Sequence, residues 1–538
     1  MPLTQKPAVT LANLSFTWPD GTPVFGGLSA TFNSGRTGLI GDNGTGKTTL
    51  LRLIAGDLVP TSGSVTTAGQ VGHLPQQLTL RTGATVAELL GVQHRLAALR
   101  AIESGNADPV HFDALADDWD VEARSLAVLD RIGLPGIALD RSVGTLSGGE
   151  TVLAAIAGVQ LSGAEIVLLD EPTNNLDRDA RQLLDEAIDA WRGTLIVVSH
   201  DVALLNLMDA TAELRDGNLT VFGGVYDAYQ EYLAGEQAAA EQALRSAEQQ
   251  LRTEERQRAE AQTKLARRRR YARTDFENKR KPKMIMNNRK QEAQVSAGKL
   301  RGQLDASLDA AKDTVAEREQ RVRRDSAITI TLPDPDVPSG RRLAELRDRR
   351  GHVVLMQGPE RVALTGRNGI GKTRLLEALM RPDAPRGRDY PARPYTDRIG
   401  YLPQRLDHLD DGATILDTVR RVAPSVPHGG LRAGLARFLF RGDVVDRPLG
   451  DLSGGERFRV ALATLLLADP PNQLLILDEP TNNLDLHTVD ELVDALSVYR
   501  GGLLVVSHDD AFLDRLGIGT WIVMDERGLH HRHEMPRR

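Results

Sequence analysis

The chain has 538 residues, a formal net charge of -7, 41% hydrophobic residues and 26% charged residues. One hydrophobic core rarely serves more than about 300 residues, so we expect several domains, and this composition excludes a wholly disordered chain. The absence of cysteine excludes disulfides, thiolate metal sites and cysteine nucleophiles.

Hydrophobic runs give no sign of a membrane segment. The longest of them, such as EIVLL and TLIVV, are far shorter than the roughly 20 residues that cross a bilayer. The N-terminal MPLTQKPAVT lacks the apolar core of a signal peptide. We therefore expect a cytoplasmic protein with no membrane partner domain of its own.

Five short motifs occur twice in the same order. The first half contains GDNGTGKTT (41–49), HLPQQ (73–77), LSGGE (146–150), IVLLDEPTNNLD (166–177) and LIVVSHD (195–201). The second half contains GRNGIGKTR (366–374), YLPQR (401–405), LSGGE (452–456), LLILDEPTNNLD (474–485) and LLVVSHD (503–509). We predict two homologous α/β nucleotide-binding domains, at 5–232 and 326–530, followed by a tail at 531–538.

The first repeated motif is a P-loop, because GDNGTGKT and GRNGIGKT fit G-x-x-x-x-G-K-[ST] between an apolar strand and a helix. The glycines let backbone N–H groups face phosphates at a helix N-terminus. Lys47 and Lys372 are predicted to reach the β- and γ-phosphates of ATP, and Thr48 and Thr373 to bind Mg²⁺. The predicted loop residues are Gly41, Asp42, Asn43, Gly44, Thr45, Gly46, Lys47, Thr48 and Thr49, then Gly366, Arg367, Asn368, Gly369, Ile370, Gly371, Lys372, Thr373 and Arg374. The alternative is a plain glycine-rich turn between strand and helix.

A carboxylate pair ends each apolar strand of the DEPTNNLD motif. IVLLD reads as a buried parallel strand, so Asp170, and likewise Asp478, should lie at the sheet edge where ligands bind. There they can share Mg²⁺ with the P-loop threonine. The next residue, Glu171 or Glu479, is placed to act as general base on the water that attacks the γ-phosphate. An adjacent acid pair could instead be a solvated helix cap.

Histidine and glutamine recur at matching places in both halves. His200 and His508 follow strong strand patterns, so each should lie at the same sheet edge and sense the γ-phosphate. A lone histidine at a strand end usually has no such role, and the recurrence is what favours it. Gln76 and Gln404, each after Leu-Pro, are predicted to contact Mg²⁺ or the attacking water, although glutamine is common in loops.

Between the halves, the composition shifts to Ala, Gln, Glu and Arg, with almost no glycine or proline, which predicts long helices. Two apolar stripes with heptad spacing flank a break at Pro282. They consist of Ala240, Leu244, Ala247, Leu251, Ala261 and Leu265, and of Leu304, Leu308, Ala311, Val315 and Val322. We predict an antiparallel helical hairpin over 233–325, with arms of roughly 60 Å.

The tip of this hairpin, residues 264–290, is strongly basic. It holds twelve Lys or Arg residues against Asp275 and Glu277, a net charge of +10 in a chain of -7. Basic residues interleaved with aromatic and methionine side chains suit structured RNA, although a basic surface alone would not distinguish RNA from DNA or anionic lipid, or from a solvated helix face. The predicted contact residues are Arg267, Arg268, Arg269, Arg270, Phe276, Lys279, Arg280, Lys281, Lys283, Met284, Ile285 and Met286.

LSGGE separates the ATP-binding-cassette ATPases from other P-loop proteins, and the sequence resembles that superfamily over nearly all of both halves. LSGGE with glutamate, the doubled DEPTNNLD, two cassettes in one chain and no membrane segment resemble the ABC-F family. The resemblance implies a monomer whose cassettes pair head to tail, with each ATP held between one P-loop and the other half's signature. ATP would close this clamp and hydrolysis would reopen it. The signature residues are Ser147, Gly148, Gly149, Ser453, Gly454 and Gly455.

The halves also differ. Trp18 stands where cassettes usually stack an aromatic residue on adenine, whereas ITITLPDPDVPSG, taken as the matching segment of the second half, offers none. Leu153 stands where the second half has Arg459, which predicts unequal sites. The first half carries a short acidic insertion near 95–125, which is either a surface helix pair or the arm with which the family docks partners.

The resemblance further implies a function. In ABC-F proteins the linker enters the tRNA exit site of the ribosome and points toward the peptidyl-transferase centre, and its long form here is similar to members that dislodge antibiotics. We therefore expect an ATP- and Mg²⁺-dependent ATPase that contacts large-subunit rRNA and P-site tRNA and protects the ribosome from large-subunit drugs. The alternatives are a housekeeping translation or ribosome-assembly factor and, less favoured, the ATPase subunit of a transporter.

Overall fold

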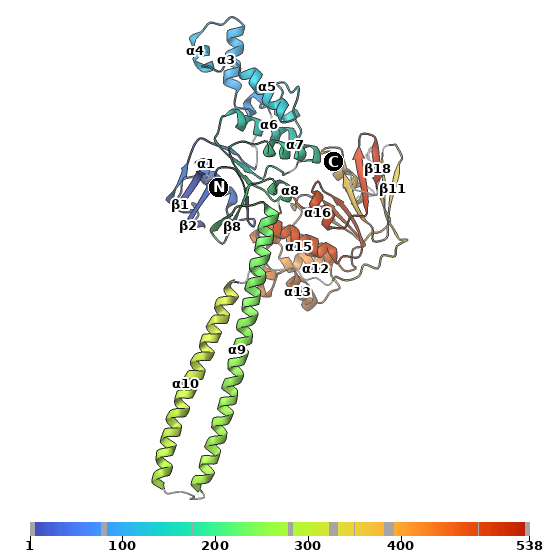
Figure 1. Ribbon diagram of the computed structural model, residues 1–538. Helices are drawn as coiled ribbons and strands as arrows, with labels where there is room; N and C mark the ends of the chain where they lie inside the picture. The colour runs from blue at the N-terminus through green and yellow to red at the C-terminus, as the bar shows by residue number, and fades with distance from the viewer. Residues whose placement is uncertain are drawn as a thin grey trace. The chain divides into compact units, whose positions relative to one another are not determined.

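Two compact units make up the chain in the computed structural model (Figure 1). One comprises Met1–Tyr226 and Ala327–Arg538, and the other comprises Asp227–Ser326. The structure describes residues 6–76, 83–174, 176–277, 283–321, 332–348, 350–380, 392–482 and 484–532. The first unit holds both repeated halves, called cassettes 1 and 2 below.

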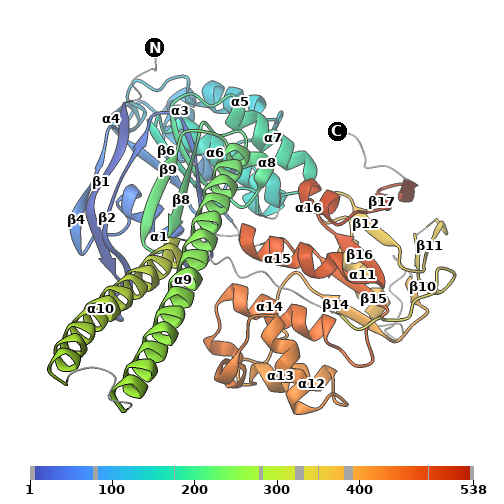
Figure 2. The ribbon, with the colours of Figure 1, turned by 60° about the horizontal axis from the view of Figure 1, so that its bottom comes forward.

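Each cassette is built on a six-stranded sheet, and the two sheets have the same strand order. Figure 2 labels most of the strands of the second sheet. In cassette 1 the order is β5 (Val71–Leu74), β6 (Ile166–Asp170), β7 (Thr194–Val198), β3 (Arg36–Ile40), β8 (Ala210–Arg215) and β9 (Asn218–Phe222). In cassette 2 it is β14 (Ile399–Leu402), β15 (Leu474–Asp478), β16 (Gly502–Val506), β12 (Arg361–Thr365), β17 (Thr520–Asp525) and β18 (Gly528–Arg532). All neighbours are parallel except the last pair. The predicted α/β class with two P-loop domains is confirmed.

The central strands are apolar because helices cover both faces of the sheet. Every residue of β6, β7, β15 and β16 is buried. Since the strands are parallel, their carboxyl ends share one edge of the sheet. This arrangement brings the loop after β3, the carboxylates after β6 and the histidine after β7 to the same place in cassette 1, and its counterpart repeats in cassette 2.

Helices connect these strands. Cassette 1 contains α1 (Lys47–Ala55), α2 (Val86–Leu89), α3 (Gln93–Glu103), α4 (Pro109–Leu115), α5 (Val121–Arg131), η1 (Val143–Thr145), α6 (Gly148–Leu161), α7 (Arg178–Asp189) and α8 (Val202–Leu205). Cassette 2 contains α11 (Lys372–Met380), α12 (Ile415–Val422), α13 (His428–Arg437), η2 (Gly442–Asp446), η3 (Leu449–Asp451), α14 (Gly454–Leu466), α15 (Leu486–Ser497) and α16 (Asp510–Arg515). The insertion predicted near 95–125 corresponds to α3, α4 and the start of α5.

A three-stranded antiparallel sheet completes each cassette. It consists of β1 (Pro7–Thr17), β2 (Pro23–Asn33) and β4 (Ser62–Thr67) in cassette 1, and of β10 (Arg342–Arg347), β11 (Val353–Gln357) and β13 (Ala392–Pro394) in cassette 2. The turn that holds Trp18 joins β1 to β2, so its counterpart is the turn at 348–352, between β10 and β11. The alignment with ITITLPDPDVPSG was therefore wrong, since strand pairing places DRRGH there. That turn also lacks Phe, Tyr and Trp.

Asp348 organises this turn of cassette 2. The residue is 3% exposed, and its carboxylate accepts backbone N–H bonds from Arg350 (2.8 Å), His352 (2.9 Å) and Leu529 (3.1 Å), while His352 Nδ1 lies 2.8 Å from Oδ2. Burial raises the pKa of Asp348, but the hydrogen bonds to its carboxylate outweigh burial and lower the pKa to about 2. The charged carboxylate therefore stabilises the fold.

We expect Asp348→Ala to lower the free energy of unfolding by about 2 kcal/mol at pH 7, because it leaves buried backbone N–H groups without acceptors. The folded-state pKa lies below the ordinary 3.8. The contribution is therefore complete above about pH 4 and is lost as pH falls toward 2. Urea unfolding at pH 7 and at pH 3 measures both effects. Asp20→Ala is the control, since Asp20 is exposed in the matching turn of cassette 1 and accepts one backbone bond, from Thr22; equal losses for the two variants would contradict the prediction.

The second unit is a pair of helices, α9 (Tyr226–Glu277) and α10 (Lys283–Arg321), which lie side by side in Figures 1 and 2. At 1.5 Å per residue, their 52 and 39 residues span about 78 Å and about 58 Å. Helix α9 starts earlier than the predicted residue 233. The expected break at Pro282 lies outside the described residues. Among the helices that the structure describes, none is long and apolar enough to cross a bilayer.

The heptad stripes form the seam of this hairpin. Ala247, Leu265, Leu308 and Ala311 are buried. The other predicted seam residues that the structure describes are half-buried, namely Ala240, Leu244, Leu251, Ala261, Leu304 and Val315. An ion pair of 2.8 Å between Arg258 Nε and Asp305 Oδ1 crosses the two helices. The predicted antiparallel hairpin is confirmed.

Candidate functional site

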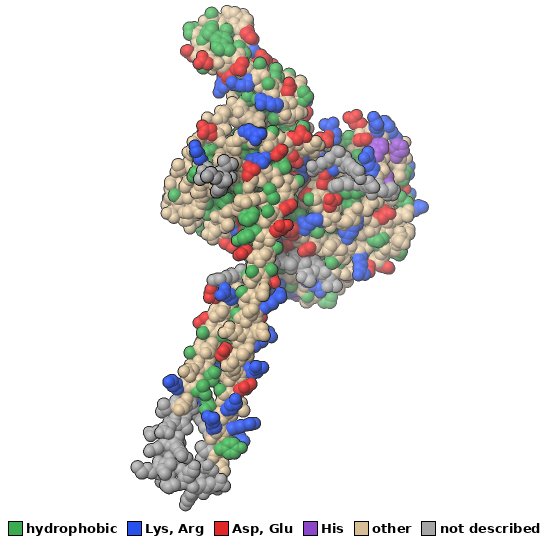
Figure 3. Space-filling view, viewed as in Figure 1, with side chains coloured by type: hydrophobic (Ala, Val, Ile, Leu, Met, Phe, Trp, Pro, Cys, Tyr) green, Lys and Arg blue, Asp and Glu red, His purple; other side chains and the backbone are tan. Residues whose placement is uncertain are grey.

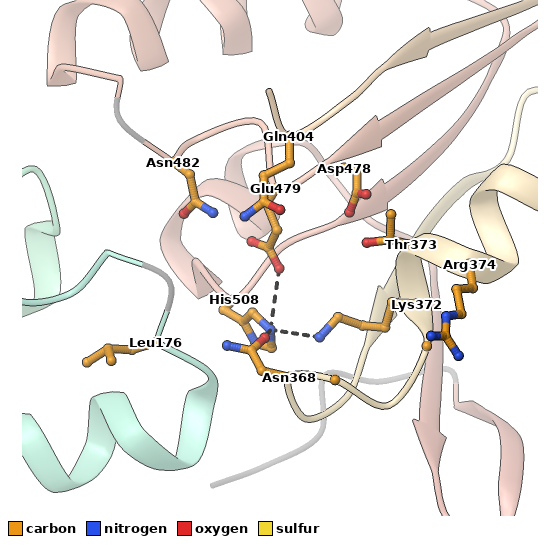
Figure 4. Close-up of a pocket in the computed structure, with 12 residues that line it drawn as sticks. Leu176, Asn368, Lys372, Thr373, Arg374, Gln404, Asp478, Glu479, Asn482 and His508 are labelled. Atoms are coloured by element: carbon orange, nitrogen blue, oxygen red, sulfur yellow. Dashed lines mark hydrogen bonds and ion pairs between the residues drawn. The ribbon is translucent and has the colours of Figure 1, made fainter. Parts of the chain in front are cut away.

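Each P-loop lines a cavity at the carboxyl edge of its sheet. The cavity of cassette 1 measures about 330 Å³ and that of cassette 2 about 420 Å³. The predicted residues that line the first are Trp18, Asn43, Gly44, Gly46, Lys47, Thr48, Thr49, Gln76, Asp170, Glu171 and His200. Those that line the second are Asn368, Gly369, Gly371, Lys372, Thr373, Arg374, Gln404, Asp478, Glu479 and His508 (Figure 4).

The remaining predicted loop residues shape the P-loops without lining the cavities; they are Gly41, Asp42, Thr45, Gly366, Arg367 and Ile370. Gly41 has φ 151°, and a Cβ there would lie 2.4 Å from the carbonyl oxygen of Leu214, so only glycine fits. Gly366 is held in the same way, because its Cβ would lie 2.2 Å from Met524 O. These close approaches explain why the motif begins with glycine.

The P-loop lysines are buried and point back into their own loops. Lys47 is 6% exposed, and its Nζ donates to Gly41 O at 2.6 Å and Asp42 O at 3.0 Å. Lys372 bonds similarly to Gly366 O and also lies 2.9 Å from His508 Nε2 (Figure 4). Burial lowers the pKa of both lysines, and nearby carboxylates oppose that shift. A phosphate group would replace the backbone carbonyls as the partner of each ammonium.

Buried carboxylates beside the P-loop threonines are the groups that fit a divalent cation. Asp170 and Asp478 are 2% and 1% exposed, and neither oxygen of Asp170 has a hydrogen-bond partner of good geometry among the described residues. Burial raises the pKa of both carboxyls, while Thr48 and Thr373 act in the opposite direction from close range. An unpartnered buried carboxylate is costly unless a cation binds it. Within the described ranges, no group of three or more His, Asp or Glu side chains could hold a metal alone, so phosphate oxygens and water would complete a Mg²⁺ site.

A glutamate and a histidine face each other at each site. His200 Nε2 lies 3.1 Å from Glu171 Oε1, and His508 Nε2 lies 3.3 Å from Glu479 Oε1. Burial raises the pKa of Glu171 to about 8 and that of Glu479 to about 7, and it lowers the pKa of both histidines to about 3. The histidines are therefore neutral at pH 7. Both glutamates also adopt positive φ, 51° and 47°, a strained conformation that is typical of functional sites.

The signature motifs begin helices α6 and α14. Ser147 Oγ accepts from Glu150 N at 3.1 Å while Glu150 Oε2 accepts from Ser147 N at 2.7 Å, and Ser453 and Glu456 form the same reciprocal cap. The glutamate of LSGGE therefore has a structural role. None of the six predicted signature residues lines either cavity, so their expected position across from the P-loops stays a prediction.

The aspartate that ends each NNLD motif accepts a hydrogen bond from the opposite P-loop, a role that the sequence analysis did not predict. Asn43 N donates to Asp485 Oδ2 at 2.7 Å, and Asn368 N donates to Asp177 Oδ2 at 3.2 Å. Leu176 of cassette 1 also lines the cavity of cassette 2 (Figure 4). Further lining residues that were missed are Val24, Asn174, Val198 and Asn482. Asn174, Asn482 and the aspartates belong to a repeated motif, and that recurrence was the available signal.

The structure explains two differences between the cassettes. Trp18 lines the first cavity and contacts Phe16 edge to face, with 5.0 Å between the ring centroids. Arg459 Nη1 lies 3.4 Å from the buried Glu491 Oε1. The counterparts in cassette 1 are the buried Leu153 and the half-buried Leu183, since Leu183, like Glu491, is the sixth residue after the NNLD aspartate. Both leucines belong to one hydrophobic cluster, so cassette 1 has apolar side chains where cassette 2 has an ion pair.

Part of the predicted tip can be located on the hairpin. Arg267, Arg268 and Arg270 are exposed near the end of α9, where Tyr271 is 75% exposed. Figure 3 shows Lys and Arg side chains along the hairpin. Lys279, Arg280 and Lys281 lie outside the described residues. The same holds for the side chains of Arg269, Phe276, Lys283, Met284, Ile285 and Met286, which belong to helical segments. The tip contacts therefore stay predictions.

Comparison with known proteins agrees with this geometry. A family model described as ABC transporter matches residues 25–174 and 354–482. The tylosin resistance ATP-binding protein TlrC of Streptomyces fradiae is 33% identical over 511 residues, covering 88% of this chain and 89% of that protein. The ATP-binding protein Uup of Haemophilus influenzae is 30% identical over 519 residues, covering 88% and 72%.

Solved structures share the fold. An archaeal ribosome recycling factor, aABCE1, in complex with the ribosomal stalk protein aP1, has a TM-score of 0.58 at 20% identity and covers 97% of this chain and 89% of that chain. A structure entitled RNase-L Inhibitor has the same scores and coverage. At this identity the likeness concerns the fold.

Proposed function

Because this chain belongs to the ATP-binding cassette family, as a tandem-cassette ATPase of the ABC-F group, we propose that it binds the ribosome and protects it from antibiotics that act on the large subunit. The observation that carries the proposal is the helical hairpin between the cassettes, whose far end concentrates positive charge. The similarity of the whole chain to a tylosin resistance protein, over most of both sequences, supports the drug-related role.

In the proposed cycle, ATP binds at both cavities. Lys47 and Lys372 would hold the β- and γ-phosphates, and Trp18 would stack on adenine at the first site. Asp170 with Thr48, and Asp478 with Thr373, would hold Mg²⁺, and Gln76 and Gln404 would contact it or the attacking water. Bound Mg²⁺ would neutralise phosphate charge. Glu171 and Glu479 take the proton of the attacking water in their ionised forms, which the charges of Lys47 and Lys372 favour, while the neutral His200 and His508 bond to the γ-phosphate.

Closure of the cassettes would couple this chemistry to the hairpin. The NNLD aspartates already bond to the opposite P-loops. With ATP bound, Ser147, Ser453 and the glycines after them would complete the phosphate cage through hydroxyl and N–H groups at helix N-termini. The closed form would fit the tRNA exit site, where the hairpin displaces a drug directly or by shifting P-site tRNA and rRNA. Hydrolysis would release it.

A housekeeping role in translation or ribosome assembly is the second candidate, since the ATP-binding protein Uup, whose name mentions no resistance, is also 30% identical over 519 residues. A transporter subunit is a third, and the long hairpin between the cassettes argues against it.

Expression in a drug-sensitive host tests the proposal. We expect the full chain to raise the inhibitory concentration of at least one large-subunit drug by about fourfold or more, as ribosome occupancy by a tight binder would, and to sediment with ribosomes in ATP. No rise for any such drug, with ribosome binding retained, would favour the housekeeping role. Sedimentation with membranes instead would favour the transporter role.

A further inference from the structure

Helices α7 and α15 present different side chains to the two ATP sites. Each helix follows the aspartate that contacts the opposite P-loop, so its first turns lie at the boundary between the cassettes. Counting from that aspartate, Arg178 corresponds to Leu486 and Arg181 to Val489. The first turn of α7 thus carries two arginines where that of α15 carries leucine and valine, and none of these four residues is among those that line the two cavities.

Two ion pairs hold these arginines in place. Arg178 Nη2 lies 2.8 Å from Asp510 Oδ2 of cassette 2, which fixes the start of α7 against the other cassette. Arg181 Nη1 lies 2.8 Å from Asp201 Oδ2, and the two side chains are 16% and 15% exposed. Asp201 in turn caps α8 through bonds from Ala203 N and Leu204 N. The Arg181 guanidinium is therefore largely desolvated and fixed in orientation.

The charge of Arg181 acts across the boundary between cassettes. It interacts electrostatically with Glu479, His508 and Asp509 of cassette 2. Geometry agrees, because Arg181 lies one helical turn after Arg178, whose partner Asp510 is the second residue after His508. Val489 occupies the matching place in cassette 2. The second site therefore has a cation in trans where the first has an apolar side chain.

We propose that Arg181 is a positioning residue in trans for the second ATP site, where its guanidinium, oriented by Asp201, places beside Glu479 and His508 a positive charge that the first site lacks. The inference rests on the proposed roles of Glu479 and His508 at the γ-phosphate. A fixed charge in a water-poor site stabilises the negative charge that gathers on the transferring phosphoryl group. The second site should therefore hydrolyse ATP faster than the first.

Four single variants of the full chain test this. Arg181→Ala should lower kcat for ATP about tenfold with KM changed less than about twofold, because a fixed charge beside the transferring phosphoryl group acts mainly on the transition state. Arg181→Lys should restore kcat to within about threefold, since it keeps the charge. Asp201→Asn keeps the cap of α8 but removes the ion pair that orients Arg181. Its kcat should therefore fall less than that of Arg181→Ala. Arg515→Ala is the matched control, because Arg515 pairs at 2.7 Å with Asp490 and joins the same two helices of cassette 2 without reaching a site.

Site assignment uses single-turnover cleavage of pre-bound ATP in Glu171→Gln and Glu479→Gln backgrounds, which leave only the second or the first site able to cleave. Arg181→Ala should slow ATP cleavage in the Glu171→Gln background, where the second site acts. It should leave cleavage unchanged in the Glu479→Gln background, where the first site acts. Equal slowing in both, no cleavage in the Glu171→Gln background, or equal losses for Asp201→Asn and Arg181→Ala would each overturn the inference. If Glu479→Gln by itself left second-site cleavage intact, the proposed role of Glu479 would be wrong instead.

Discussion

Replacing both Glu171 and Glu479 by glutamine is expected to lower ATP turnover about 10²- to 10⁴-fold while ATP binding persists, because the amide cannot accept the proton of the attacking water. Both side chains are largely buried, and each contacts a neutral histidine. Glutamine has nearly the same shape as glutamic acid, so the pockets should stay intact. Phosphate release measures turnover, and equilibrium binding of a fluorescent ATP analogue measures affinity.

The same double variant should remain on ribosomes when ATP is present, since the clamp closes but does not reopen. Sedimentation through sucrose, followed by a chase with excess unlabelled protein, measures its residence. The control is Glu103→Gln with Glu526→Gln, one exposed glutamate in each cassette, which should exchange like the wild type. Rapid exchange of the catalytic double variant off ribosomes would refute the clamp.

Loss of the basic end of the hairpin is expected to abolish protection without affecting the ATPase. Arg267, Arg268 and Arg270 are exposed on α9, and replacing all three by alanine removes charges suited to RNA phosphates. We expect ribosome affinity to fall about 10- to 100-fold in low salt and to depend less steeply on salt concentration, because fewer counterions are released. Basal ATP hydrolysis should change less than about twofold, since the cassettes contain every nucleotide-binding motif.

A second triple variant controls for charge as such. Arg245, Arg252 and Arg256 are exposed on the same helix, away from the predicted tip. Their replacement by alanine removes the same number of charges and should leave both protection and ribosome binding nearly unchanged. If the tip variant lost ATPase activity and protection together, the division of labour between cassettes and hairpin would be wrong.

The sequence by itself determined the repeated cassettes, the P-loops, the carboxylates that end the buried strands and the hairpin seam. Each of these rests on spacing within a short segment. GDNGTGKT specifies a turn whose glycine Gly41 no other residue could replace, and IVLLD specifies a buried strand that ends at Asp170. Heptad spacing likewise placed Leu265 and Leu308 in the seam of two paired helices. Local geometry sets the outcome in all these cases, so the residues alone sufficed.

Only the tertiary structure decided which distant residues meet. The bond from Asn43 to Asp485 joins positions 442 residues apart, and no local pattern predicts such a pair. Strand pairing, not sequence similarity, showed that the connection that begins at Asp348 is the counterpart of the turn that holds Trp18. Arg181 carries no signal in its local sequence, and only folding pairs it with Asp201, 20 residues away. Contacts between cassettes depend on how two folded surfaces fit together, and that information is spread over the whole chain.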